Sequence, residues 1–115
     1  MLSNRMFVHT KVFDKLWELQ GGNDDALREL QKAILKNPQG YPVIKGTGGV
    51  RKIRISLDGR GKSGGARVLY IDFVSKGIVG LLYVYPKSEK DNIDHNEKKI
   101  IKTMAEQINK HWREK

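Results

Sequence analysis

The stretch at residues 45–67, KGTGGVRKIRISLDGRGKSGGAR, decides how this chain is organised. It holds seven Lys or Arg residues and one acidic residue, Asp58, so it carries +6 of the chain's formal net charge of +9. Its periodicity predicts a strand over 50–57, a Gly-rich loop over 58–65 and the start of another strand at Ala66. Clustered positive charge on a strand, loop and strand is typical of a surface that binds a polyanion.

Apolar periodicity predicts the remaining elements. They are a strand over 5–9, a helix over 11–20, a helix that starts at 23–25 and ends at 37–38, strands over 66–74 and 78–85, and a helix after residue 94. Gly21 and Gly22 stop the first helix, and Asp94 with Glu97 has the pattern of a capping box before the last. The order β-α-α-β-β-β-α predicts an α+β fold in a single domain over 1–115. We expect a curved antiparallel sheet, an N-terminal helical hairpin against one face and a C-terminal helix against the sheet.

Alternation along the strands assigns candidate binding residues to faces. Lys52 and Arg54 share one face of the first basic strand. Tyr83 and Tyr85 share one face of the last strand, and Lys87 continues the same alternation beyond Pro86. Aromatic side chains beside cations suit single-stranded RNA, because bases stack on rings and phosphates pair with cations. Ordinary packing in the core is the competing interpretation for both tyrosines.

Arg67 is the most unusual of the basic residues. It opens the strand over 66–74 on the same side as Leu69, Ile71 and Phe73. A guanidinium on an otherwise apolar face must find a partner or lie at an open edge. Arg67 is therefore either a binding group at the end of the sheet or one half of a buried structural ion pair.

Composition excludes several classes of protein. The chain has no cysteine and only three widely spaced histidines, so we expect neither a metal site nor a cofactor. No apolar run approaches the roughly 20 residues of a membrane span, and the N-terminus lacks a signal-peptide core, so we expect a cytoplasmic protein without membrane contact. Gly61-Lys62-Ser63 is not a phosphate-binding P-loop, because position 56 is Ser56 and a strand follows. A pI near 9.9 favours RNA, DNA or an acidic protein as the partner.

Several motifs in order resemble the RelE/HigB family of bacterial toxins from type II toxin–antitoxin modules. They are GTGGVRKIR at 46–54, GRGKSGGARVLY at 59–70 and YPKSEKDNI at 85–93. The likeness is to the HigB-like branch, with its pattern GTGGxRKxR, GxGxxGGxRxxY and YxKxExxxL. The resemblance covers nearly the whole chain, and the family's element order is the one predicted above.

The resemblance implies a ribosome-dependent mRNA interferase that cuts mRNA in the ribosomal A site and inhibits translation. The ribose 2′-OH attacks the adjacent phosphate, without a metal ion or other cofactor. Carried over by motif, the catalytic residues are Lys52, Arg54, Arg67 and Lys87. Partners implied are mRNA on the ribosome, ribosomal RNA and a cognate antitoxin protein, with no membrane. The RNA- and ribosome-binding residues that we expect are Lys45, Arg51, Arg60, Lys62 and Tyr85.

The general base stays open, because relatives often carry a tyrosine or histidine where this chain has Ile93 or Asp94-His95. Lys52, Glu89 and His95 are the candidates. Two other functions compete with the interferase: a ParE-like toxin that inhibits DNA gyrase, which would lack the basic cluster, and a nucleic-acid-binding module without catalysis.

Overall fold

The structure, a computed structural model, describes residues 4–57 and 65–112. The order β-α-α-β-β-β-α is confirmed, with a short 3₁₀ helix (Val74–Lys76) between the last two strands. The predicted boundaries differ from the observed ones by one or two residues. The elements are β1 (Met6–His9), α1 (Lys11–Leu19), α2 (Asp24–Lys36), β2 (Arg51–Ile55), β3 (Ala66–Phe73), β4 (Ile78–Pro86) and α3 (His95–His111).

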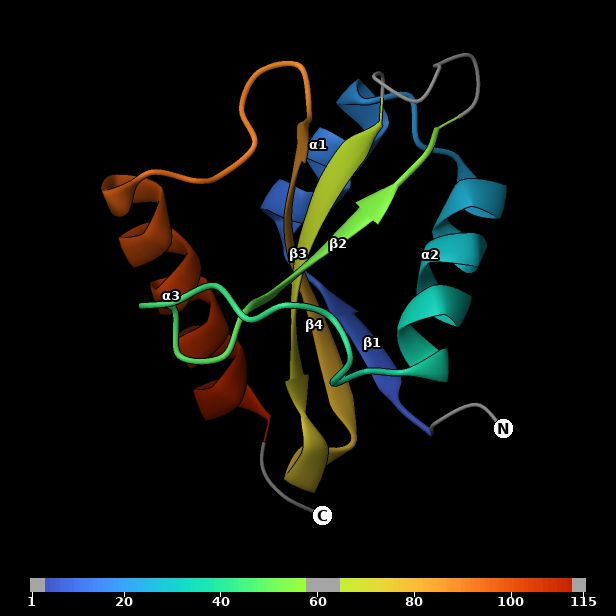
Figure 1. The fold of residues 1–115 in the computed structure, drawn as a ribbon. Helices are drawn as coiled ribbons and strands as arrows, with labels where there is room; N and C mark the ends of the chain where they lie inside the picture. Colours follow the sequence, from blue (N-terminus) through green and yellow to red (C-terminus); the bar gives the residue numbers. More distant parts are fainter. Residues whose placement is uncertain (1–3, 58–64, 113–115) are drawn as a thin grey trace.

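The four strands form one curved sheet in the order β1-β4-β3-β2 (Figure 1). The pairs β2–β3 and β3–β4 are antiparallel, as predicted. β1 pairs with β4 in parallel, so the expectation of a wholly antiparallel sheet is wrong. The reason is that alternation identifies a strand and its faces but carries no information about its direction. The central position of β3 and β4 explains why both strands are strongly apolar.

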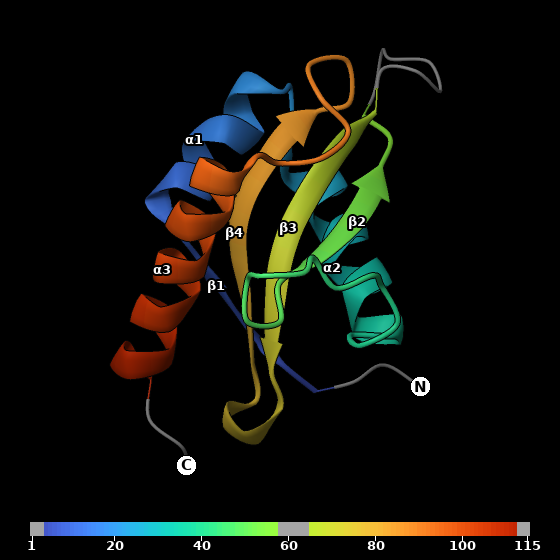
Figure 2. The same ribbon diagram turned by 60° about the vertical axis from the view of Figure 1, so that its left-hand side comes forward.

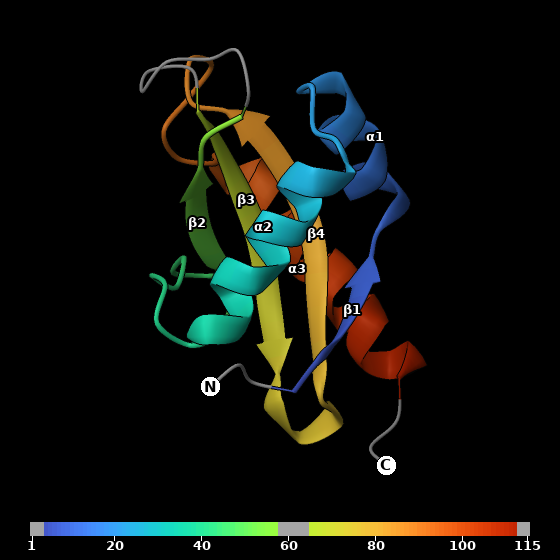
Figure 3. The same ribbon diagram turned by 90° about the vertical axis from the view of Figure 1, so that its right-hand side faces the viewer.

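The helices cover opposite faces of the sheet. Figure 3 views the sheet from the side of α1 and α2, with α3 behind, and Figure 2 brings α3 to the front. The helical hairpin therefore packs as predicted. The core between α1, α2 and the sheet is made by Phe13, Trp17, Leu30, Ile34, Ile53, Leu57, Ala66, Val68, Tyr70, Val79, Leu81 and Val84. The core under α3 is made by Val50, Leu69, Ile71, Leu82, Tyr85, Ile93, Ile101, Ala105 and Ile108.

A β-bulge at Leu82 changes which face β4 presents. Leu69 pairs with Tyr83 and Tyr70 pairs with Leu81, so Leu82 has no pairing partner on β3. Its carbonyl accepts a hydrogen bond from the hydroxyl of Thr10 at 2.9 Å. One extra residue inverts the alternation, and bulges of this kind often lie beside functional sites because they re-aim side chains. Beyond the bulge, β4 turns its tyrosines toward α3.

The turn between α1 and α2 leaves no room for a side chain at Gly22. A Cβ at this position would lie 2.3 Å from Cε2 of Trp17, whose ring is buried in the core. We therefore expect Gly22→Ala to lower the free energy of unfolding by about 1–3 kcal/mol, since the ring must shift. Urea denaturation measures this loss. In a Trp17→Leu background the same substitution should cost less, and an equal cost in both backgrounds would show that the clash is not the cause.

Candidate nucleic-acid interface

Two rows of side chains cross β2, β3 and β4 on the face that α3 covers. Arg54 pairs with Arg67, and Arg67 pairs in turn with Tyr85. In the neighbouring row, Lys52 pairs with Leu69, and Leu69 pairs with Tyr83. Three of the four predicted catalytic residues, Lys52, Arg54 and Arg67, thus lie together with both tyrosines at one end of the sheet.

The pairing of Arg54 with Arg67 places two guanidinium groups directly opposite each other on one face. Like charges in that position destabilise a sheet, because opposed Cβ atoms lie only about 5 Å apart. Arg54 is exposed to water, whereas the side chain of Arg67 is only 3% exposed. Water therefore screens the repulsion poorly at Arg67, and an anion on this face would relieve it.

The loop that connects β4 to α3 supplies that anion. This β4–α3 loop (residues 87–94) runs from the end of β4 back to α3 on the same side of the sheet (Figure 2, orange). The carboxylate of Asp91 accepts a hydrogen bond from Nη2 of Arg67 at 2.9 Å. Nζ of Lys52 donates to the Asp91 carbonyl at 3.3 Å and to Oδ1 of Asn92 at 3.0 Å. The hydroxyl of Tyr85 donates to the same Asp91 carbonyl at 3.1 Å.

Arg67 is therefore one half of a buried ion pair, which is the second of the two alternatives predicted from the sequence. The two partners differ in exposure, because the Asp91 side chain is 60% exposed. Nε of Arg67 is buried and has no hydrogen-bond partner among the described residues. An unsatisfied buried donor costs free energy, so the guanidinium retains a capacity for a second oxygen ligand that Asp91 does not fill.

The electrostatics of the site favour a bound anion. The hydrogen bond from Arg67 lowers the pKa of Asp91 below the usual carboxyl range, and the charges of Lys52 and Arg54 act in the same direction. Burial raises the pKa of Tyr85 to about 12. The Tyr85 hydroxyl therefore stays protonated near neutral pH, where it can donate a hydrogen bond but cannot act as a general base.

The other predicted residues are more dispersed. Lys87 is exposed at the start of the β4–α3 loop, and its backbone N–H donates to the Gly65 carbonyl at 3.0 Å. Lys45 is exposed and lines a cavity of about 260 Å³ together with Lys52 and Tyr85. The predicted residues Arg60 and Lys62 lie outside the described residues.

Arg51 faces away from this group. Its Nη1 donates to the carbonyls of Gln39 at 2.9 Å and Tyr41 at 2.7 Å, and so ties the segment after α2 to β2. A role in RNA binding for Arg51 stays a prediction. Two of the candidate bases, Glu89 in the β4–α3 loop and His95 at the start of α3, are exposed, whereas Lys52 is in direct contact with the loop.

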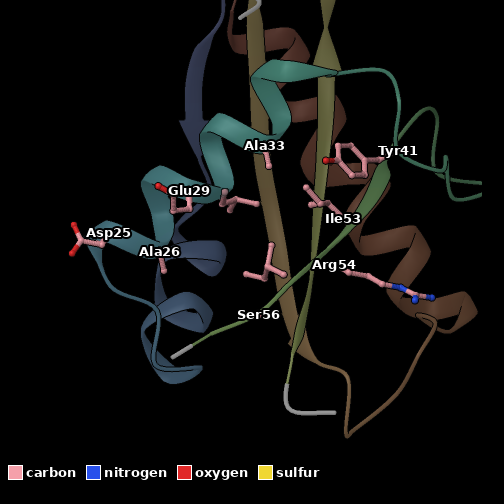
Figure 4. A pocket seen from close by; sticks show the side chains of 10 residues that line it. Asp25, Ala26, Glu29, Ala33, Tyr41, Ile53, Arg54 and Ser56 are labelled. Carbon is pink, nitrogen blue, oxygen red and sulfur yellow. The ribbon is translucent and has the colours of Figure 1, made fainter. Parts of the chain in front are cut away.

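A second hollow, between α2 and β2, has a different character. It has a volume of about 340 Å³, and the carboxylates of Asp25 and Glu29 lie on its α2 side. Figure 4 shows the guanidinium of Arg54 directed away from these carboxylates. Both carboxylates are paired with cations of α2, Asp25 with Arg28 and Glu29 with Lys32.

Sequence reasoning missed Asp91 and Asn92. Neither residue belongs to a motif with a chemical role, and strand alternation ends before the β4–α3 loop begins. The available signal was indirect: three cations on one face at one end of the sheet require an anion nearby. That signal does not identify the carboxylate that pairs with these cations.

None of the helices within 4–57 and 65–112 has the length and apolar character needed to cross a membrane. In the same two ranges, no three His, Asp or Glu side chains gather in a group able to hold a metal ion.

The fold and this basic face define a small α+β protein with Lys52, Arg54 and Arg67 clustered at one end of its sheet. Residues 4–115 match the family model described as the RelE toxin of the RelE/RelB toxin–antitoxin system. The chain belongs to this family of toxins. The fold is similar to that of a mutant of the Escherichia coli toxin RelE in the free state, in which two arginines are replaced by alanine. That comparison has a TM-score of 0.52 and 19% identity, and it covers 73% of this chain and 82% of the other.

Proposed function

We propose that this RelE-family toxin is a ribosome-dependent mRNA interferase of the HigB-like branch. It enters the A site of a translating ribosome and cleaves the mRNA there. One observation carries the proposal: Arg67 donates to the Asp91 carboxylate, Lys52 donates to the Asp91 carbonyl, and Arg54 pairs with Arg67 on the same face of the sheet. Cations fixed close to one anion position can stabilise the negative charge of a phosphorane-like transition state.

The proposed reaction is a transesterification within the RNA. The ribose 2′-oxygen forms a bond to the adjacent phosphorus while the bond from phosphorus to the 5′-oxygen breaks. The 2′-hydroxyl proton passes to a general base, and the 5′-oxygen takes up a proton as it leaves. The products are a 2′,3′-cyclic phosphate and a 5′-hydroxyl, and the balance requires no metal ion or redox partner.

Each basic residue has a proposed part in this reaction. Arg67 holds the scissile phosphate, because it is the most buried of the cations and its Nε has no partner in the part of the chain that the structure describes. Lys52 and Arg54 stabilise the phosphate and assist proton transfer. Lys87 binds the substrate backbone or the leaving group. Tyr85 is only 2% exposed in the core under α3, so it can contact a base only after the chain that covers it moves. Lys52, Glu89 and His95 remain the candidate bases, and the high pKa of Tyr85 argues against it in that role.

The basic surface also supports contacts with other macromolecules. We propose that Lys45, Arg51, Arg60 and Lys62 contact RNA of the ribosome, so that association weakens as salt rises. We also propose that the cognate antitoxin is an acidic protein whose charge complements the basic sheet face.

A purified translation system separates the three candidate functions. An interferase is expected to remove full-length mRNA only when ribosomes are translating it. A gyrase inhibitor would leave the mRNA intact and block DNA supercoiling by purified gyrase. A module that only binds nucleic acid would slow translation without new RNA ends. Intact mRNA at a concentration of protein that stops translation would overturn the proposal.

A further inference from the structure

The β4–α3 loop covers the anion site of the free protein with its own carboxylate. Asp91 lies on Arg67, and Lys52 and Tyr85 both donate to the Asp91 backbone carbonyl. In this arrangement only 3% of the Arg67 side chain is exposed to solvent. A phosphodiester therefore cannot reach the guanidinium while Asp91 stays in place.

We propose that the free protein is self-occluded: Asp91 occupies the position of the RNA phosphate, and the β4–α3 loop must swing away before RNA binds. The inference rests on the proposed function for the identity of the ligand, a phosphodiester of single-stranded RNA. The internal carboxylate of Asp91 and an external phosphate compete for the guanidinium of Arg67.

Nε of Arg67, which has no hydrogen-bond partner within residues 4–57 and 65–112, is the reason that a phosphate can displace Asp91. Asp91 engages Nη2 alone. A phosphate carries two non-bridging oxygens and can accept from Nε and Nη2 together in the bidentate manner that arginine favours. RNA would therefore satisfy a buried donor that the closed loop leaves unsatisfied, and it would also relieve the repulsion between Arg54 and Arg67.

The exposure of the two partners indicates which one moves. Arg67 is buried among core residues, whereas the Asp91 side chain is 60% exposed and can rotate into water. The ends of the loop are held separately: the Lys87 backbone N–H bonds to Gly65, and Ile93 is buried under α3. The segment 88–92 between these anchors is the part that we expect to move.

The closed loop lowers the apparent affinity of the protein for RNA. The apparent affinity for RNA is the intrinsic affinity multiplied by the fraction of molecules whose loop is open. Because Arg67, Lys52 and Arg54 lower the pKa of Asp91, the carboxylate remains charged near neutral pH and the closed state persists there. A substitution that weakens the Asp91–Arg67 pair should raise the open fraction and tighten binding.

The first test measures affinity with a fluorescent 2′-O-methyl RNA, which cannot be cleaved because its 2′-oxygen is blocked. Fluorescence anisotropy on the full chain is expected to show Asp91→Asn binding about tenfold more tightly than the wild type, within the usual range of conformational coupling. Glu106→Gln on α3 is the control for net charge, and it should change affinity much less. Equal gains in both variants, no gain in Asp91→Asn, or no RNA binding by either protein would overturn the proposal.

The second test needs no substitution. Hydrogen exchange of the wild-type chain, with and without saturating 2′-O-methyl RNA, is expected to show faster exchange in 88–92 when RNA binds. A loop that stays in place beneath the RNA would exchange more slowly or at the same rate, which contradicts the inference. The two proposals fail separately: a chain that shows this loop response but leaves translated mRNA intact is self-occluded and not an interferase. A chain that cleaves without this response is an interferase without occlusion.

Discussion

Arg5→Ala is expected to lower the free energy of unfolding by about 3–5 kcal/mol, the usual cost of leaving a buried charge without its partner. Nε of Arg5 donates to Oδ1 of Asp72 at 2.7 Å, and Nη2 donates to Oδ2 at 3.2 Å. The Asp72 side chain is only 2% exposed. Removal of Arg5 leaves this carboxylate buried and unpaired, and it also releases the start of β1 from β3. Urea denaturation at neutral pH measures the loss.

A double substitution provides the control for this prediction. Arg5→Ala combined with Asp72→Ala removes both charges, so it should cost less than Arg5→Ala alone. The exposed pair Arg28–Asp25 on α2 is the contrasting case, because exposed ion pairs contribute about 0–1 kcal/mol. If Arg5→Ala proved as mild as Arg28→Ala, the pair with Asp72 would not hold β1 to the sheet as described.

Arg67→Ala is expected to reduce the rate of mRNA cleavage on translating ribosomes by about 10²–10³-fold, the typical cost of removing one fixed donor to a developing charge. The physical reason is that Arg67 is the most buried and most fixed of the three cations around the anion position. Single-turnover cleavage at saturating ribosome concentration measures the chemical step apart from docking.

Two controls keep this prediction interpretable. A urea denaturation curve establishes whether Arg67→Ala is folded, since the substitution also leaves a small cavity under the β4–α3 loop. Lys45→Ala removes one exposed positive charge near the site without touching the anion position, so it should weaken ribosome binding slightly and leave the saturated rate nearly unchanged. A folded Arg67→Ala protein that cleaves at the wild-type rate would remove Arg67 from the catalytic set.

Most of the fold could be predicted because local signals and tertiary packing agree. The amphipathic stripe of α1 ends at two glycines, and Asp94 with Glu97 forms the capping box that the sequence predicts. The direction of β1 and the bulge at Leu82 could not be predicted. Both depend on partners distant in the chain: β1 pairs with β4, and the Leu82 carbonyl is satisfied by Thr10.

The candidate site was only partly predictable for a similar reason. Alternation placed Lys52 and Arg54 on one face, and the structure adds Arg67 and Tyr85 in register beside them. Alternation also separates Arg51 from that face, although charge alone had grouped it with the others. The contact of Asp91 with Arg67 was not predicted, because it depends on the path of the β4–α3 loop. Sequence periodicity predicts helices and strands but not the path of a loop.

Mapping the ends of an mRNA translated in a purified system, with and without this protein, tests the central claim most directly. We predict new ends inside the codon that occupies the A site, with a 2′,3′-cyclic phosphate on one fragment and a 5′-hydroxyl on the other. These ends should be absent when ribosomes are omitted and strongly reduced with Arg67→Ala. Intact mRNA, or ends that form equally well on free RNA, would contradict it.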